Sequence, residues 1–284
     1  MKIFPLEVPV PRRHQYLLGC ISPRPIAFAS TMDKQGNPNV SPFSFFNCIG
    51  SNPPIVVFSP ARSGRDNTTK NTLDNVEETR EVVINIVNYA MVQQMSLASA
   101  PYPKGVNEFE KTGLTPIPSE LVKPYRVKES PAQLECKVLD IIKTGTEGSA
   151  GNIVICEVVC MHIDDRVLDE EGKVSPYLFD QVARMGGDYY CRVIPESIFK
   201  LPQPKDTSGI GVDALPAAIR NSTILTGNDL GKLGVMTAIP RIDEAEPYLQ
   251  EANGLTVEEL HKRAHSMLEE GKVYEAFCLL MVKD

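Results

Sequence analysis

Two long extended segments in the middle of the chain constrain its fold more than any other feature. Residues 132–144 and 153–166 both have the composition of β-strands, and residues 144–151 between them are typical of a turn. Each segment is far longer than the about six residues of an average strand. Strands of that length stay in one sheet when the sheet coils, so the pair predicts a barrel-like, mainly β fold.

Shorter segments extend this pattern on the N-terminal side. Residues 33–38 form a dense turn signal between two extended segments, which indicates a hairpin. Residues 1–25 contain several prolines, and we expect them to be mostly extended. The predicted strands are residues 26–31, 39–49, 55–59, 82–87, 132–144 and 153–166, and the predicted helices are residues 69–79 and 89–100.

The composition narrows the class of protein. With 284 residues, 42% of them hydrophobic, the chain can bury a core in one large domain or in two small ones. Its formal charge of −7 argues against nucleic acid or an anionic membrane as the partner, and no apolar run is long enough to span a bilayer. Seven cysteines without a C-x-x-C pair, and no secretory segment after Met1, predict reduced thiols and a cytoplasmic location.

The C-terminal part of the chain differs from the rest. Residues 201–211 are rich in proline and glycine, and they predict a boundary between a domain of residues 1–200 and an extension of residues 201–284. The role of the extension cannot be deduced from its sequence.

An amphipathic helix is predicted within the extension. Thr256 begins a capping-box pattern, and Gly271 is a plausible stop. We expect the apolar tail, residues 276–282, to pack on the barrel or on a second subunit. His261 and His265 have the four-residue spacing of helical zinc ligands, but a third ligand and a general-base carboxylate are missing, so no metal is predicted there.

Residues 63–72, S-G-R-D-N-T-T-K-N-T, gather cations and hydrogen-bond donors at what should be a helix N-terminus. Such an end carries unpaired backbone N–H groups and partial positive charge, so it binds phosphate readily. The alternative is that Thr68 or Thr69 only caps the helix and that the cations are solvated. The side chains available to a phosphate are Arg62, Arg65, Asn67, Thr68, Lys70 and Thr72.

Residues 41–47, S-P-F-S-F-F-N, interleave hydroxyl groups with aromatic rings. Simple alternation would direct Phe43 and Phe45 into a core. Phe45 and Phe46 in succession break that alternation, and Asn47 follows at once, as expected where the end of a strand faces a flat, partly polar ring. Together with the candidate phosphate-binding segment, this pattern suits flavin mononucleotide (FMN), which has a conjugated ring at one end and a phosphate at the other.

Other motifs carry less information. Cys156, Cys160 and His162 fall on one face of a predicted strand among Ile and Val, which favours core thiols. The sequence contains no G-x-S-x-G, no Walker loop and no G-x-G-x-x-G. We therefore expect no separate dinucleotide-binding domain, and NAD(P)H would have to bind transiently over the flavin.

Eight segments, in this order, resemble the flavin reductase-like proteins, and the flavoredoxin branch looks nearest. The resemblance covers about residues 1–200. The segments are R-P-I-A-x-x-S-T from Arg24, G-x-x-N-V-S-P-F-S-F-F-N from Gly36, P-P-I-V-V-F-S from Pro53, K-N-T-L-D-N from Lys70, E-V-V-I-N from Glu81, N-E-F-E-K-T-G-L-T from Asn107, S-P-A-Q-L-E-C from Ser130 and R-M-G-G-D-Y-Y from Arg184.

This resemblance implies the FMN-binding split barrel, a mainly β fold with a Greek-key-type barrel of six strands, peripheral helices and, here, a C-terminal extension. It also implies a homodimer with FMN near the subunit interface. The residues implied for the phosphate are Arg62, Asn67, Lys70 and Thr72, and those implied for the ring and ribityl chain are Ser30, Thr31, Ser44, Phe45, Phe46 and Asn47.

Two positions depart from the family pattern. Many flavin reductases of this fold carry a histidine in a G-x-H-x-x-x-x-G-x-V block where this chain has Asn152, which puts direct NAD(P)H oxidation in question. Asn71 stands where the phosphate motif has an aspartate, which removes a negative charge near the phosphate.

The expected function is that of an FMN-dependent oxidoreductase, which passes reducing equivalents from NAD(P)H or another donor to a flavin or another acceptor. No catalytic acid or base is named, because the flavin does the redox chemistry and the protein sets position, potential and access. One alternative is a non-enzymatic, flavoredoxin-type electron carrier that works with a partner protein. Another is a pocket for pyridoxal phosphate or a haem-related ligand.

Overall fold

The computed structural model describes residues 1–204 and 208–282, so residues 205–207 of the predicted domain boundary lie outside the described residues. The chain forms two compact units, Met1–Phe199 and Lys200–Asp284, each with a hydrophobic core of its own. Every strand that the structure describes belongs to the first unit. Among the described helices, none is both long and apolar enough to cross a membrane.

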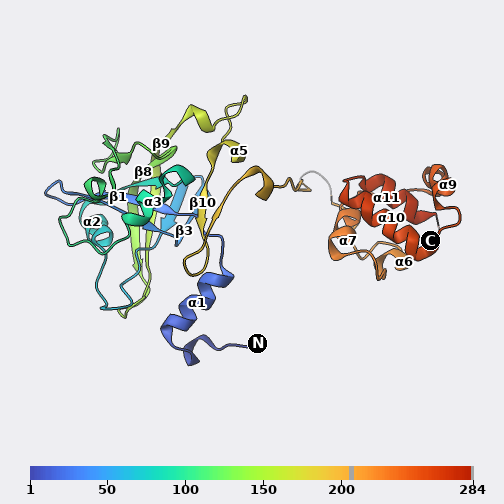
Figure 1. Ribbon diagram of the computed structural model, residues 1–284, viewed down its shortest axis with the longest axis horizontal. Helices are drawn as coiled ribbons and strands as arrows, with labels where there is room; N and C mark the ends of the chain where they lie inside the picture. The colour runs from blue at the N-terminus through green and yellow to red at the C-terminus, as the bar shows by residue number, and fades with distance from the viewer. Residues whose placement is uncertain (205–207, 283–284) are drawn as a thin grey trace. The chain divides into compact units, whose positions relative to one another are not determined.

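The first unit is built on one seven-stranded antiparallel sheet (Figure 1). Its strand order is β2-β1-β5-β8-β9-β4-β3, and β6 with β7 and β10 with β11 form two small additional sheets. The strands are β1 (Ala27–Met32), β2 (Pro38–Phe43), β3 (Phe46–Ser51), β4 (Pro54–Phe58), β5 (Glu81–Ile86), β6 (Pro116–Ile117), β7 (Arg126–Val127), β8 (Ala132–Lys143), β9 (Asn152–Ile163), β10 (Val182–Arg184) and β11 (Tyr190–Arg192).

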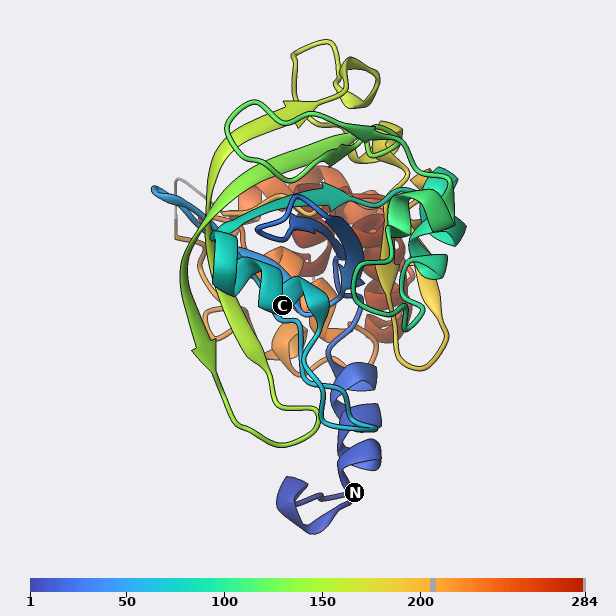
Figure 2. The same ribbon diagram turned by 90° about the vertical axis from the view of Figure 1, so that its left-hand side faces the viewer.

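The long hairpin of β8 and β9 confirms the prediction made from the two long extended segments. The two strands pair along their whole length, with shifts of register next to Cys136 and before Asp140. Such bulges bend a strand and increase its twist. The hairpin therefore coils, as Figure 2 shows in green and yellow-green.

The two edge strands of the sheet, β2 and β3, are consecutive in the chain and are separated only by Ser44 and Phe45. The sheet must curl to bring its edges together at this corner. Residues 39–49, which the sequence predicted as one strand, are thus two strands, and the predicted count of six is wrong by one. Within the described residues β2 and β3 do not pair, so the fold is mainly β sheet with helices and a closed barrel is not shown.

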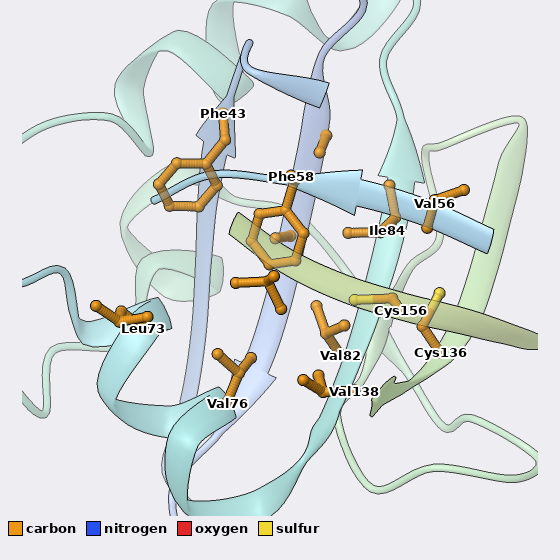
Figure 3. Packing of buried hydrophobic residues seen from close by; sticks show 13 residues of the cluster. Phe43, Val56, Phe58, Leu73, Val76, Val82, Ile84, Cys136, Val138 and Cys156 are labelled. Carbon is orange, nitrogen blue, oxygen red and sulfur yellow. The ribbon is translucent and has the colours of Figure 1, made fainter. Parts of the chain in front are cut away.

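One hydrophobic cluster of the first unit lies inside the curled sheet (Figure 3), and a second packs β1 and β2 against η2, α3 and α4. The rings of Phe43 and Phe58, from β2 and β4, pack with their centroids 5.7 Å apart. Burial raises the pKa of the Cys156 thiol to about 12 and raises that of Cys136 well above its ordinary value. Both are therefore core thiols, as the sequence indicated for Cys156. The same prediction is wrong for Cys160, which is half-buried and lies beyond the register shift next to Glu135.

Helices and short turns surround this sheet. The predicted helices at residues 69–79 and 89–100 are confirmed as α2 and as η2 with α3. The prediction that residues 1–25 are extended is wrong, because α1 lies there; its proline sits in the first turn, where a missing N–H costs no hydrogen bond. The elements are η1 (Pro5–Glu7), α1 (Val10–Cys20), α2 (Asn71–Thr79), η2 (Tyr89–Met91), α3 (Val92–Leu97), α4 (Glu108–Thr112), η3 (Asp165–Val167), α5 (Pro176–Phe179) and η4 (Pro195–Ser197).

The second unit is helical in its described residues. The capping box at Thr256 is confirmed, and Gly271 follows the helix with a φ of 81°. The expectation for the tail is wrong, because Phe277 and its neighbours are buried in the core of this same unit, against α10. The helices are α6 (Ala217–Arg220), α7 (Gly227–Gly234), α8 (Ile242–Ala245), η5 (Glu246–Tyr248), α9 (Leu249–Ala252), α10 (Val257–Glu269) and α11 (Val273–Met281).

The two histidines of α10 have separate partners. The Nδ1 atom of His261 lies 2.7 Å from the hydroxyl of Ser222, and that of His265 lies 2.8 Å from a carboxylate oxygen of Asp229. Burial lowers the pKa of His261. Each histidine thus joins α10 to a different neighbouring segment of the second unit.

Replacing Phe58 by alanine tests the core of the curled sheet. We expect Phe58→Ala to lower the free energy of unfolding of the first unit by about 3–5 kcal/mol, the usual cost of emptying a phenylalanine site. Urea denaturation followed by circular dichroism measures it. The matched control is Leu139→Ala on β8, whose side chain is exposed and should change the same quantity by less than about 0.5 kcal/mol. Equal effects of the two changes would contradict this account of the core.

Candidate functional site

The helix start that the sequence singled out has no side-chain cap. Helix α2 begins at Asn71, and Lys70 is its N-cap residue, in an extended conformation without a capping hydrogen bond. Thr68 instead donates its hydroxyl to Asp66. Hydrogen bonds from Ser63, and then from Thr68, lower the pKa of the Asp66 carboxyl to about 2. The alternative that Thr68 or Thr69 caps the helix therefore fails. The Leu73 N–H donates to the Lys70 carbonyl over 2.9 Å. Among the described residues, the N–H groups of Asn71 and Thr72 have no hydrogen-bond partner, so these two are available to an anion.

Arg62 is held in place before this helix. Its Nε atom donates to Oδ1 of Asn67 over 2.6 Å, and its Nη2 atom donates to the Asn67 carbonyl. Asn67 adopts a left-handed φ of 59° and donates its own amide to the Thr146 carbonyl over 3.0 Å. Arg65 and Lys70 are exposed, and no ion pair involves either of them among the residues that the structure describes. The loop thus carries Arg62, whose side chain is held by hydrogen bonds, and the exposed cations of Arg65 and Lys70, which have no ion-pair partner among the described residues.

The β8–β9 hairpin supports the loop that carries these cations. The Arg62 N–H donates to the Ala150 carbonyl over 2.9 Å, and the Ser149 N–H donates to the Arg62 carbonyl over 3.1 Å. The contact is close, since a Cβ atom on Gly64 would lie 2.7 Å from Oγ of Ser149. The turn of the hairpin and the loop are therefore packed directly against each other.

Asn152 belongs to this support. It is 1% exposed, and its side-chain amide donates to the Pro60 carbonyl over 2.9 Å. Its backbone N–H donates to the hydroxyl of Ser59, also over 2.9 Å. The sequence marked Asn152 only as a departure from a family histidine. In the structure its side chain is directed at the start of the loop.

Three of the predicted site residues are buried and bonded inside the protein. The hydroxyls of Thr72 and Thr31 both donate to Oδ1 of Asn39, over 2.9 and 3.3 Å, and that of Ser30 donates to the Tyr125 carbonyl. Asn39 in turn donates to Glu108 over 2.8 Å, and burial raises the pKa of Glu108. These hydroxyls connect the start of α2 to β1 and β2. Sequence reasoning missed Asn39, the centre of the network.

The other predicted residues lie at the corner between β2 and β3. Phe45 is 41% exposed, Phe46 is half-buried against the core, and Asn47 is exposed. The Phe45 carbonyl accepts a hydrogen bond of 2.9 Å from the N–H of Ser59, which lies three residues before Arg62. The aromatic corner, residues 44–47, is therefore joined to the strand end that leads into the cationic loop, residues 62–70.

Arg24 is a residue of this corner that the sequence did not single out. It is 5% exposed, and its guanidinium donates to the carbonyls of Leu18 (2.7 Å) and Met185 (2.9 Å), with Oγ of Ser44 at 3.5 Å. Burial, and then the nearby charge of Arg184, lower its pKa. Within the described residues Arg24 has no carboxylate partner. A buried positive charge thus stands next to the aromatic corner.

A largely apolar cavity of about 700 Å³ opens next to the same corner. Phe46 and Asn47 lie on its wall, together with parts of β4, β9 and β10, the segment before β1, and single residues of β5, β8 and α5. Its size is that of small-molecule sites. The polar groups of the loop and the apolar surface beyond the corner therefore give this region two chemically distinct ends.

The comparisons with known proteins identify the family of the first unit. A family model described as "Flavin reductase like domain" matches residues 18–186, and the chain belongs to this family. An uncharacterised protein of Aquifex aeolicus is 35% identical over 188 residues, which are 66% of this chain and 93% of that relative. The family prediction is confirmed, and the second unit lies outside the matched residues.

Solved structures support the fold. Component B of nitrilotriacetate monooxygenase from Bacillus cereus is 30% identical, with a TM-score of 0.66 over 71% of this chain and 98% of that one. A chain from Shewanella frigidimarina, described as a flavin reductase with split barrel domain, is 28% identical, with a TM-score of 0.60 over 70% and 96%. The flavoredoxin of Desulfovibrio vulgaris, at 23% identity and a TM-score of 0.54 over 64% and 91%, shows likeness of fold alone.

Replacing Asn152 by alanine tests the support of the loop. We expect Asn152→Ala to lower the free energy of unfolding of the first unit by about 1–3 kcal/mol, because it leaves the Pro60 carbonyl unpaired. Amide hydrogen exchange should become faster in residues 60–68. The control is Asn228→Ala, an exposed asparagine of α7, which should leave exchange in the loop unchanged. Unaltered exchange in both variants would contradict a supporting role for Asn152.

Proposed function

We propose that the first unit binds FMN and acts as a flavin-dependent oxidoreductase. The phosphate would lie at the start of α2, and the ring would lie along the corner from Ser44 to Asn47. The observation that carries this proposal is the uncapped helix start with unpaired cations, placed next to an aromatic corner. Family membership supports a flavin as the ligand.

The phosphate end has the chemistry that a phosphate monoester requires. The N–H groups of Asn71 and Thr72 would donate to its oxygens, and the helix dipole favours negative charge there. Lys70 would add a full charge. Arg62 is already directed by Asn67 and loses little side-chain freedom on binding. Thr72 would contribute indirectly, because its hydroxyl bonds Asn39 and so fixes the start of α2 against β2.

The ring end offers an aromatic surface and a positive charge. Phe45 presents an exposed ring, and the main chain around Phe46 ends a strand. Bound flavin would supply the electron-accepting chemistry that side chains lack. Arg24, buried beside Ser44 without a carboxylate partner, would favour the negative charge that accompanies reduction. Ser30 and Thr31 are buried and would not contact the ligand through their side chains. Their hydrogen bonds would instead fix the position of the main chain in this region.

NAD(P)H is the donor we favour, bound transiently in the apolar cavity. Membership of the flavin reductase-like family supports a protein that hands on reducing equivalents. In the family pattern, Asn152 replaces a histidine, which put NAD(P)H oxidation in question. The Asn152 side chain bonds the Pro60 carbonyl, so we give this replacement less weight in choosing the donor. The second candidate is an electron carrier fed by a partner protein, which the flavoredoxin-like fold permits. We expect a homodimer in the cytoplasm for either function.

Comparison of FMN with riboflavin tests the phosphate site. We expect Lys70→Ala to weaken FMN binding about 10- to 100-fold, the equivalent of one charged hydrogen bond, and to leave riboflavin binding unchanged, because riboflavin has no phosphate. Flavin fluorescence titration measures both. The control is Lys34→Ala in the turn between β1 and β2, an exposed lysine that should affect neither ligand. Equal affinity of the unmodified protein for FMN and riboflavin would refute the proposed phosphate site.

An anaerobic absorbance titration with NADH and then NADPH tests the reaction. For a nicotinamide-dependent reductase, the flavin bands bleach promptly with one of the two donors. Bands that persist until dithionite is added favour the electron carrier. If the purified protein shows no flavin bands and acquires none after incubation with FMN, the proposed cofactor is wrong, and pyridoxal phosphate or a haem-related ligand becomes the next candidate.

A further inference from the structure

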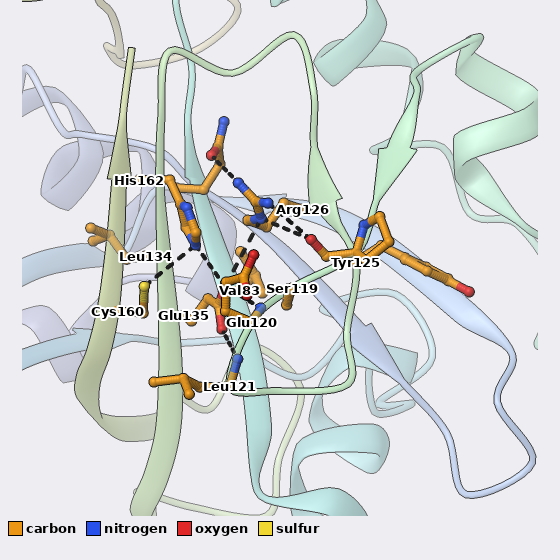
Figure 4. A network of polar contacts seen from close by, with 12 residues as sticks. Val83, Ser119, Glu120, Leu121, Tyr125, Arg126, Leu134, Glu135, Cys160 and His162 are labelled. Carbon is orange, nitrogen blue, oxygen red and sulfur yellow. Dashed lines mark hydrogen bonds and ion pairs between the residues drawn. The ribbon is translucent and has the colours of Figure 1, made fainter. Parts of the chain in front are cut away.

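Glu135, Cys160 and His162 come together on β8 and β9 (Figure 4). Glu135 and Cys160 are register partners across the two strands, and His162 lies two residues farther along β9, on the same face. The shift of register next to Glu135 places these side chains opposite one another. Local bulges of this kind often re-aim side chains at functional sites.

The donor atoms of the three side chains converge. Nε2 of His162 lies 2.7 Å from Oε1 of Glu135 and 3.5 Å from Sγ of Cys160. All three donor atoms lie within 4.8 Å of one another. A single proton on Nε2 can serve only one of the two neighbours well, whereas one cation between the three atoms could accept a lone pair from each of them.

Glu135 is a fixed ligand. Its side chain is fully buried. The N–H groups of Glu120 and Leu121 donate to its two oxygens over 2.8 and 2.7 Å. Arg126 stands 3.9 Å from Oε1, beyond hydrogen-bond distance. The carboxylate is thus oriented before any ion arrives.

We propose that Glu135, Cys160 and His162 form a Zn²⁺ site. Thiolate, imidazole and carboxylate are the ligands that zinc uses, and zinc is commonly bound by three protein ligands with a fourth position left to water. The two negative ligands would neutralise the ion. His162 is 23% exposed and Cys160 is half-buried, so an ion can reach the site.

Binding of Zn²⁺ to this site would release protons from the ligands. Cys160 releases its thiol proton to solvent as the sulfur–zinc bond forms. His162 binds through Nε2, so the proton that a neutral imidazole carries must sit on Nδ1. One proton therefore leaves for each ion bound to the neutral-imidazole form. The site is independent of the proposed flavin chemistry, because none of its residues lies at the corner or in the cationic loop.

Metal titration of the full-length protein, without a histidine tag, tests this proposal. We expect one Zn²⁺ per chain in competition with a chromophoric chelator, and Co²⁺ in its place should show a thiolate-to-cobalt charge-transfer band. Cys160→Ser should abolish that band. Cys160→Ser should also weaken zinc binding. Mutating a residue that only supports a metal ligand costs about 10- to 100-fold in affinity, and we expect a larger loss here because a ligand itself is removed.

The matched control is Cys191→Ser, a half-buried cysteine on β11, which should change neither the stoichiometry nor the band. His162→Gln provides a second ligand variant that keeps a polar side chain, and it should weaken binding as Cys160→Ser does. Absence of zinc binding by the unmodified protein would overturn the proposal. So would one zinc per chain that persists unweakened in Cys160→Ser, because the ion would then be held elsewhere.

Discussion

The pairing of β8 with β9 is the constraint on which the rest of the first unit depends. This hairpin joins the two halves of the sheet, because β8 pairs with β5 on one side and β9 pairs with β4 on the other. Its coil curls the sheet and brings the outermost strands together at Ser44 and Phe45. The turn of the same hairpin holds the cationic loop, and its opposite end carries Glu135 beside His162. One supersecondary element thus positions both candidate sites.

The proposed flavin site divides its work between exposed and buried side chains. Lys70 and Phe45 are exposed and can contact a ligand directly. Thr31 and Thr72 are buried, and their hydroxyls meet at Asn39. Such a network is stable only when every member is satisfied, so it fixes the helix start relative to the strands. Precise placement of a phosphate would depend on that internal network as much as on the cations.

The buried side chains of Glu135 and Arg24, both in the first unit, differ in how their charges are compensated. Glu135 receives two backbone N–H groups and a histidine, so the protein itself compensates its charge. Arg24 is bonded to carbonyl groups and a hydroxyl but to no carboxylate among the described residues. A buried cation without a counter-ion is costly. Next to the proposed ring, an acceptor of negative charge would offset that cost, which is consistent with an electron-transfer site.

The sequence alone determined much of the fold and the family. The lengths of β8 and β9, helix α2, and the capping box at Thr256 follow from periodicity and capping residues, which are local properties of the chain. The order of the motifs identified the family. Local patterns also placed the break in alternation at Phe45 and Phe46.

Only the tertiary structure decided what the candidate site residues contact. Thr72 bonds Asn39, and Asn152 bonds Pro60 across 92 positions of the chain. Arg24 meets Met185 across 161 positions. A residue's own neighbours in sequence carry no information about such partners, because the partner is set by which strand lies alongside. For the same reason the sequence could count the extended segments but could not tell that one of them turns a corner.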